Sequence, residues 1–162
     1  MTWLAEMRVN WLERTVAGLD RVARWRGRAD DLPAHLAVGL EGEDAAYFHL
    51  LRKGYTVVAR RWSAGNLPGD IDLIAWQGAL LCIFEVKTRT ARDATPAESA
   101  VDQHKRATLR RLAWAYVRQL PQPEPPQVRF DVVSVYLERR RKDILHFQNA
   151  FAWREQRSAW DA

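Results

Sequence analysis

The feature that most constrains the fold is a pair of apolar segments joined by a short turn. Residues 71–76 are apolar and strand-like, residues 77–78 are Gln-Gly, and residues 80–86 form a second apolar run. This pattern predicts a β-hairpin inside a buried sheet. Because the two strands of a hairpin lie side by side, Asp72 is expected beside Glu85 at the open end of the hairpin.

The residues that follow Glu85 suggest a chemical role for this end of the hairpin. Side chains alternate between the faces of a strand, so Glu85 and Lys87 project together while Val86 points the other way. Two carboxylates can bind Mg²⁺ or Mn²⁺ through oxygen, and a lysine can face the attacking water or a phosphate. Asp72, Glu85 and Lys87 therefore indicate a hydrolytic metal site. The simpler interpretation is an ion pair between Lys87 and one acid, which closes the end of the sheet.

The composition predicts an ordinary soluble domain. The chain has 162 residues, of which 48% are hydrophobic and 28% are charged, and this length can bury a core. No apolar run is long enough for a membrane span or resembles a signal peptide, so a cytoplasmic location is expected. The single cysteine, Cys82, excludes an intramolecular disulfide and is expected in the core. The histidines show no zinc-ligand spacing.

The positive charge of the chain favours a polyanionic partner. The formal net charge is +5 and the isoelectric point is about 9.8, a balance that many proteins without a nucleic-acid partner also have. No helix-turn-helix, zinc finger or other base-reading signature is present, which predicts salt-dependent binding to the phosphate backbone. The candidate contacts are Arg60, Arg61, Arg89, Arg92, Arg106, Arg110 and Arg129.

Residues 1–34 are predicted to form an extension of the domain. Apolar residues at spacings of three and four, with Trp3, Trp11 and Trp25 among them, predict one amphipathic helix within residues 1–31. This helix either docks on the domain or binds a protein partner or a membrane surface. A polar face that mixes acids with bases argues against an anionic lipid surface.

The main domain is expected over residues 35–152, with a tail over residues 153–162. Residues 42–52 have a helical pattern, and Gly54 is placed to cap that helix at its C-terminal end. The other expected elements, in chain order, are strands over residues 55–62, 71–76 and 80–86, a helix over residues 95–119, and strands over residues 128–137 and 144–147. A capping pattern, Thr95-Pro96-Ala97-Glu98, begins the second helix. Four basic residues at 139–142 predict a turn.

This order of elements resembles the PD-(D/E)xK nuclease superfamily, and within it the YraN family of small bacterial proteins. The motifs that carry the resemblance are Gly42-Glu43, Gly54-Tyr55, residues 69–74, residues 84–89, Pro96, Lys105, residues 129–133 and residues 149–151. The resemblance implies an α/β, restriction-endonuclease-like sandwich with a mixed central sheet of about four to five strands flanked by helices (α-β-β-β-α-β). Two positions depart from the usual pattern: Ile71 replaces the proline before Asp72, and Asp70 replaces a glutamate.

The resemblance also implies phosphodiester hydrolysis with Mg²⁺ or Mn²⁺. Asp72 and Glu85 would bind the metal, and the backbone carbonyl of Val86 would be a third ligand. Glu43, on the first helix, would complete the site directly or through a water molecule.

Two lysines would act on the substrate in this scheme. Lys87 would orient the attacking water and offset charge in the transition state, and Lys105 would contact the phosphate or Glu43. The expected substrate is DNA, including branched or damaged forms, and junction resolvases of the superfamily suggest a homodimer by analogy. Asp131 is expected to pair with an arginine and support the sheet. The alternative is a non-catalytic nucleic-acid-binding or adaptor protein on the same fold. The sequence does not decide whether the substrate is DNA or RNA, or whether cleavage occurs within a strand or from its end.

Overall fold

The computed structural model describes residues 33–90, 101–121, 124–138 and 141–153. In chain order, its elements are α2 (Ala34–Arg52), β1 (Thr56–Trp62), β2 (Ile71–Gln77), β3 (Leu80–Arg89), α3 (Gln103–Val117), β4 (Val128–Glu138) and β5 (Arg141–Phe151). The predicted order of helix, three strands, helix and strand is confirmed, and a fifth strand follows it. The helix predicted within residues 1–31 lies outside the described residues.

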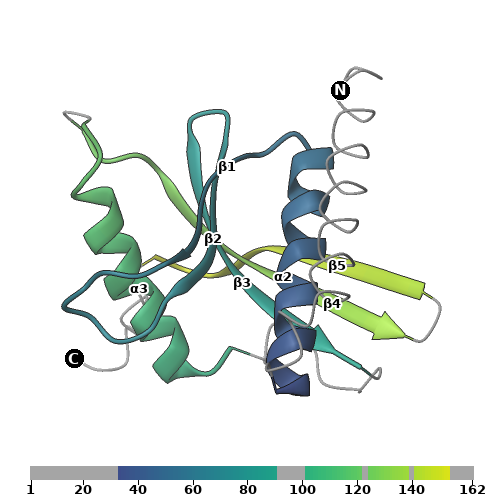
Figure 1. Ribbon diagram of the computed structural model, residues 1–162. Coiled ribbons are helices and arrows are strands. Elements are labelled where there is room, and N and C mark those ends of the chain that lie inside the picture. Colours follow the sequence, from purple (N-terminus) through teal and green to yellow (C-terminus); the bar gives the residue numbers. More distant parts are fainter. Residues whose placement is uncertain (1–32, 91–100, 122–123, 139–140, 154–162) are drawn as a thin grey trace, which may run out of the picture.

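The strands form one mixed sheet in the order β1-β2-β3-β4-β5 (Figure 1). The β3–β4 pair is parallel, and the other neighbouring pairs are antiparallel. A parallel pair needs a long crossover, and the segment that contains α3 supplies it. The expected mixed sheet is therefore confirmed.

The two helices cover opposite faces of the sheet (Figure 1). Alternation along β3 serves both layers: Phe84 packs on the α2 side and Ile83 on the α3 side. Cys82 is fully buried on the α2 side, as predicted, and burial raises the pKa of its thiol to about 11. Neither described helix is both long and apolar enough to cross a membrane.

Two glycines end elements where the sequence predicts it. Gly54 follows α2 with φ of 82°, and its N–H donates to the Leu51 carbonyl while the Tyr55 N–H donates to the Leu50 carbonyl. This is a Schellman cap, so the predicted glycine cap is confirmed. Gly78, with φ of 61°, begins the two-residue turn between β2 and β3.

Three boundaries differ from the prediction. Helix α2 begins at Ala34 instead of residue 42, because its first turns are good helix formers with little buried apolar surface to signal them. Helix α3 begins after Asp102, whose Oδ1 accepts the Lys105 N–H at 2.7 Å; the capping pattern predicted at residues 95–98 lies outside the described residues. The predicted basic turn is wrong at residues 141–142, which already pair with β4.

One glycine sets how closely α2 approaches the sheet. A Cβ built on Gly42 would lie 1.8 Å from Oγ1 of Thr88 in β3, a separation that no side chain tolerates. The next residue along α2 is Glu43. Gly42 therefore allows the helix to bring Glu43 close to the end of β3.

We expect Gly42→Ala to lower the free energy of unfolding by about 1 to 3 kcal/mol, the usual cost of overpacking, although alanine favours helices. Gly39→Ala in the same helix is the matched control, because its Cβ would have no neighbour within 4 Å. That variant should gain up to about 1 kcal/mol. Urea unfolding measures both. Adding Thr88→Ala should recover only part of the loss, since the Thr88 Cβ itself lies 2.8 Å away. Equal stability of the two alanine variants would contradict the close contact.

Candidate active site

The end of the β2–β3 hairpin is organised around the side chain of Asp72. The last paired residues of the two strands are Leu73 and Phe84, so the continued register sets Asp72 opposite Glu85. The backbone N–H of Val86 donates to Oδ2 of Asp72 at 2.6 Å. A side-chain oxygen thus accepts a backbone N–H of the neighbouring strand and fixes the orientation of this carboxylate.

Glu85 lies beside Asp72 on the α3 side and is only 4% exposed. Its Oε1 lies 2.9 Å from Nζ of Lys87, and its Oε2 lies 3.0 Å from Nζ of Lys105 in α3. Although Oε2 forms this ion pair, it is buried and has no hydrogen-bond partner of suitable geometry among the described residues. The structure therefore brings together four of the predicted residues: Asp72, Glu85, Lys87 and Lys105.

Burial and crowding of the two carboxylates change the proton affinity of the site. Burial, followed by the negative charge of Glu85, raises the pKa of Asp72 to about 7. The hydrogen bond from Val86 and the charge of Lys105 oppose this rise. Burial alone would lower the pKa of Lys105, but the carboxylate of Glu85 outweighs burial and raises it. Burial, together with the charge of Glu85, therefore favours the protonated form of Asp72.

Glu43 is near this site but is turned towards a different partner. Its carboxylate accepts two hydrogen bonds from Arg61 of β1, at 2.6 Å from Nε and 3.0 Å from the terminal nitrogen. Its charge still contributes to the raised pKa of Asp72. Among the described residues, no three acidic, histidine or cysteine side chains lie close enough to form a metal site. Asp72 and Glu85 would therefore need the Val86 carbonyl, water or a moved Glu43 as further ligands.

The predicted nucleic-acid arginines do not form one uniform surface. Arg60 pairs with Asp44, and its guanidinium lies over the Tyr47 ring. Arg106 and Arg110 each donate from Nε to a backbone carbonyl and lie over the Phe151 ring.

Three predicted arginines remain: Arg89, Arg129 and Arg92. Arg89 ends β3, close in sequence to Lys87. Arg129 is bound to Asp131, away from the acidic pair. Arg92 lies outside the described residues.

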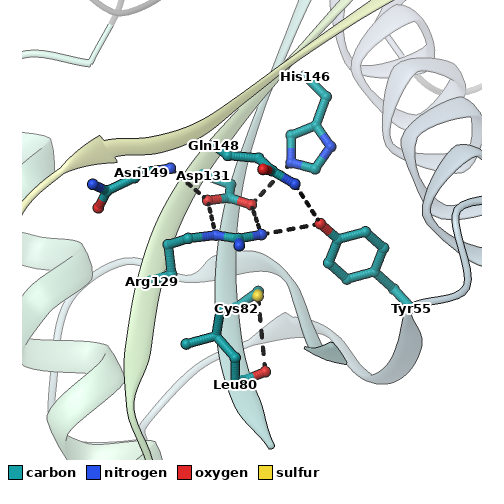
Figure 2. Close-up of polar contacts among 8 residues, drawn as sticks. All are labelled: Tyr55, Leu80, Cys82, Arg129, Asp131, His146, Gln148 and Asn149. Carbon is teal, nitrogen blue, oxygen red and sulfur yellow. Dashed lines mark hydrogen bonds and ion pairs between the residues drawn. The ribbon is translucent and has the colours of Figure 1, made fainter. Parts of the chain in front are cut away.

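A second polar cluster lies on the α2 side of the sheet, around Asp131 (Figure 2). The buried carboxylate accepts two hydrogen bonds of 2.8 Å from Arg129 and one of 2.9 Å from the Asn149 N–H, and it contacts Nε2 of His146 at 2.9 Å. Burial alone would raise the pKa of Asp131, but these donors lower it. The prediction that Asp131 pairs with an arginine is confirmed.

Sequence reasoning did not identify the other members of this cluster. The hydroxyl of Tyr55 accepts hydrogen bonds from Arg129 at 3.0 Å and from Gln148 at 2.9 Å. His146 and Gln148 are two residues apart on β5, so alternation places both on one face. If the last strand had been predicted over its full length, alternation would have placed His146 and Gln148 together on one face.

Comparison with known proteins identifies relatives over the same region. The model of a family described as uncharacterised protein family UPF0102 matches residues 42–135. A UPF0102 protein of Koribacter versatilis is 47% identical over 121 residues, which cover 75% of this chain and 83% of that protein. A UPF0102 protein of Parafrankia sp. is 42% identical over 115 residues, which cover 70% of this chain and 95% of that protein. The family match begins within α2, ends within β4, and covers β1, β2, β3 and α3 completely.

The raised pKa of Asp72 leads to a stability prediction. The carboxyl group has a pKa of 3.8 when unperturbed and about 7 in the fold. The folded state therefore holds the proton more tightly, and ionisation weakens the fold as the pH rises from about 4 to about 7. Without metal, Asp72→Asn should stabilise the protein more at pH 8 than at pH 5, by roughly 1 to 3 kcal/mol, because one pKa unit is about 1.4 kcal/mol.

Urea unfolding in a chelator at the two pH values measures this difference. Asp44→Asn is the control, because Asp44 is a partly exposed acid that pairs with Arg60 and lies outside the Asp72–Glu85 pair. Its effect should not grow with pH. A gain for Asp72→Asn that is the same at both pH values would show that Asp72 is already ionised at pH 5.

Proposed function

Because the chain belongs to the UPF0102 family, whose description assigns no activity, we propose a function from its own acidic site: the protein is a divalent-metal-dependent nuclease. The α-β-β-β-α-β order and the acids on β2 and β3 support a restriction-endonuclease-like fold with a PD-(D/E)xK site. The observation that carries the proposal is the convergence of two carboxylates and two ammonium groups at the end of one hairpin.

The side chains present fit a hard divalent cation. Glu85 is buried, and its Oε2 lies 3.0 Å from Nζ of Lys105 in a geometry unsuited to a hydrogen bond. Burial and the neighbouring charge of Glu85 raise the pKa of Asp72. Both features would be relieved by a cation held between the two carboxylates, with the Val86 carbonyl as a third oxygen ligand. Mg²⁺ and Mn²⁺ are the cations that such oxygen ligands select.

Bound metal would make a coordinated water more acidic and offset negative charge on the phosphodiester. Lys87 is 32% exposed and lies 2.9 Å from Oε1 of Glu85, so its ammonium is at the border between the acids and solvent. From there, Lys87 can donate to the attacking water and hold it towards the phosphate. Lys105 is 28% exposed and can hold the orientation of Glu85 while it faces a phosphate oxygen. These lysines and acids are the proposed catalytic and positioning groups.

The role of Glu43 depends on its pairing with Arg61. Both oxygens of Glu43 are bound to this guanidinium, whose side chain is 47% exposed. Phosphate is a strong bidentate partner for arginine, so a nucleic-acid backbone could compete for Arg61. Glu43 would then be free to complete the ligand set directly or through water. Arg60, Arg61 and Arg89 are the proposed backbone contacts on this side, and DNA is the proposed substrate.

A non-catalytic nucleic-acid-binding or adaptor protein is the second candidate function. It is favoured by the ion pairs of Glu85, whose two oxygens each face a lysine. In that case the four charged residues would only join α3 to the end of the sheet. Metal binding separates the two functions.

We expect Mn²⁺ to raise the melting temperature of the protein, because a ligand that binds only the folded state stabilises it. At a hundred times the dissociation constant, the gain is about 2.7 kcal/mol. Asp72→Ala and Glu85→Gln should remove this gain, whereas Asp44→Asn should retain it. Thermal unfolding with and without Mn²⁺ measures the effect. An equal gain in Asp72→Ala and wild type would place the metal elsewhere.

We expect cleavage by the wild-type protein in a panel of single-stranded, duplex, flapped and four-way DNA with Mn²⁺. Lys87→Ala should slow cleavage by about 100-fold or more, as does the loss of a group that stabilises a transition state, with little loss of DNA binding. Lys142→Ala is the matched control, because Lys142 is half exposed and pairs with Glu41. Binding without cleavage of any substrate, DNA or RNA, would favour the adaptor.

A further inference from the structure

A polar hollow lies on the α2 side of the sheet, apart from the acidic pair. Its volume is about 430 Å³. The end of α2, the residue after its cap, the end of β2 and strand β5 supply its lining: His49, Lys53, Tyr55, Gln77, Ile144, Leu145, His146 and Gln148. The lining contains two imidazoles, an ammonium, a phenol and two amides, but no carboxylate. Such a set of hydrogen-bond donors suits an anion.

His146 is held in a fixed orientation at the back of this hollow. Its Nε2 lies 2.9 Å from Oδ2 of Asp131, so its other ring nitrogen points away from that carboxylate (Figure 2). Asp131 also accepts hydrogen bonds from Arg129 and the Asn149 N–H, and its side chain is fully buried. The only nearby carboxylate in the described cluster is therefore occupied by its own donors and is shielded from the hollow.

Two groups in the lining could donate to a ligand: the Tyr55 hydroxyl, and His49 in the tautomer that carries its hydrogen on Nε2. Nε2 of His49 is buried and has no hydrogen-bond partner in the described part of the structure. The Tyr55 oxygen accepts from both Arg129 and Gln148, so none of its recorded contacts takes up its own hydrogen. A buried donor without an acceptor costs about 1 to 3 kcal/mol. An oxyanion in the hollow would supply oxygen acceptors for such donors.

Lys53 gives the edge of the hollow a positive charge. Lys53 is exposed at its edge, and no ion pair is recorded for it within the described residues. Burial lowers the pKa of His49, and the positive charges of His146 and Lys53 lower it further. At the C-terminal end of α2, the carbonyls of Leu50 and Leu51 accept backbone N–H groups.

We propose that this hollow binds a phosphate group, either as free phosphate or as the terminal phosphate of a nucleotide or nucleic acid. The site is independent of the proposed nuclease centre, because Glu85 pairs with α3 whereas His49 and Lys53 belong to α2 and its cap. Its ligand contacts would be Lys53, His49 and the Tyr55 hydroxyl. His146 is the positioned imidazole that would complete the set.

Titration of the full chain with inorganic phosphate tests this site by NMR of the imidazole nitrogens. We expect saturable shifts of His49 and His146, while the exposed His35 and His104 serve as internal controls. Lys53→Gln and His49→Gln should each weaken binding by about tenfold or more, as expected for the loss of a charge-assisted contact. Lys142→Gln, the control, should bind as wild type does.

Several outcomes would overturn the proposal. These are shifts that do not saturate, shifts of equal size at all four histidines, or unchanged affinity in Lys53→Gln. A response of His49 and His146 to Zn²⁺ but not to phosphate would overturn it in favour of a metal site. Asp72→Ala should bind phosphate normally, so a failure of the nuclease proposal leaves this result unaffected.

The source of the phosphate is resolved by competition in EDTA, where the proposed nuclease centre cannot act. A short oligonucleotide with a 5′-phosphate is compared with the same strand ending in a 5′-hydroxyl. Displacement of inorganic phosphate by the first strand alone identifies a nucleic-acid terminus as the ligand. Displacement by neither strand identifies free phosphate or a small phosphomonoester. Equal displacement by both would show backbone binding and would contradict a site for a terminal phosphate.

Discussion

The structure depends on keeping the charge of Glu85 buried in the middle of β3. A carboxylate in this position costs several kcal/mol unless cations and hydrogen bonds offset the loss of water. Lys87 belongs to the same strand, whereas Lys105 comes from α3. The ion pair between Lys105 and Glu85 therefore links the first turn of α3 to the sheet. The same contacts that hold α3 in place also hold two ammonium groups beside an acidic pair.

Two aspartates on opposite faces of the sheet have pKa values that are shifted in opposite directions. On the α2 side, Asp131 receives hydrogen bonds from a guanidinium and a backbone N–H and contacts an imidazole, and its pKa is lowered. On the α3 side, Asp72 receives one backbone hydrogen bond beside a second carboxylate, and its pKa is raised. The first arrangement is complete in itself and supports the sheet. The second would gain from an added cation, which is why we propose it as the site of chemistry.

Local patterns predicted the parts of the fold that depend on neighbouring residues. Apolar alternation and Gly78 gave the hairpin, and Gly54 gave the end of α2, because turns and caps need particular residues. The approach of Asp72 to Glu85 followed from that hairpin. The pairing of Glu43 with Arg61 was not predictable, because it joins a helix to an edge strand at a residue with φ of 48°. The length of β5 was missed because its polar residues alternate without an apolar signal.

The short turn at Gly78 also bears on the order in which the protein folds. A hairpin closed by two residues forms quickly, whereas the parallel β3–β4 pair and the docking of α3 require distant segments to meet. Asp72 and Glu85 would then approach each other before Lys105 arrives, with only Lys87 nearby to reduce their repulsion. Repulsion between the two carboxylates, when both are ionised, would slow this early step. A divalent ion would consequently act on the kinetics of folding as well as on the finished molecule.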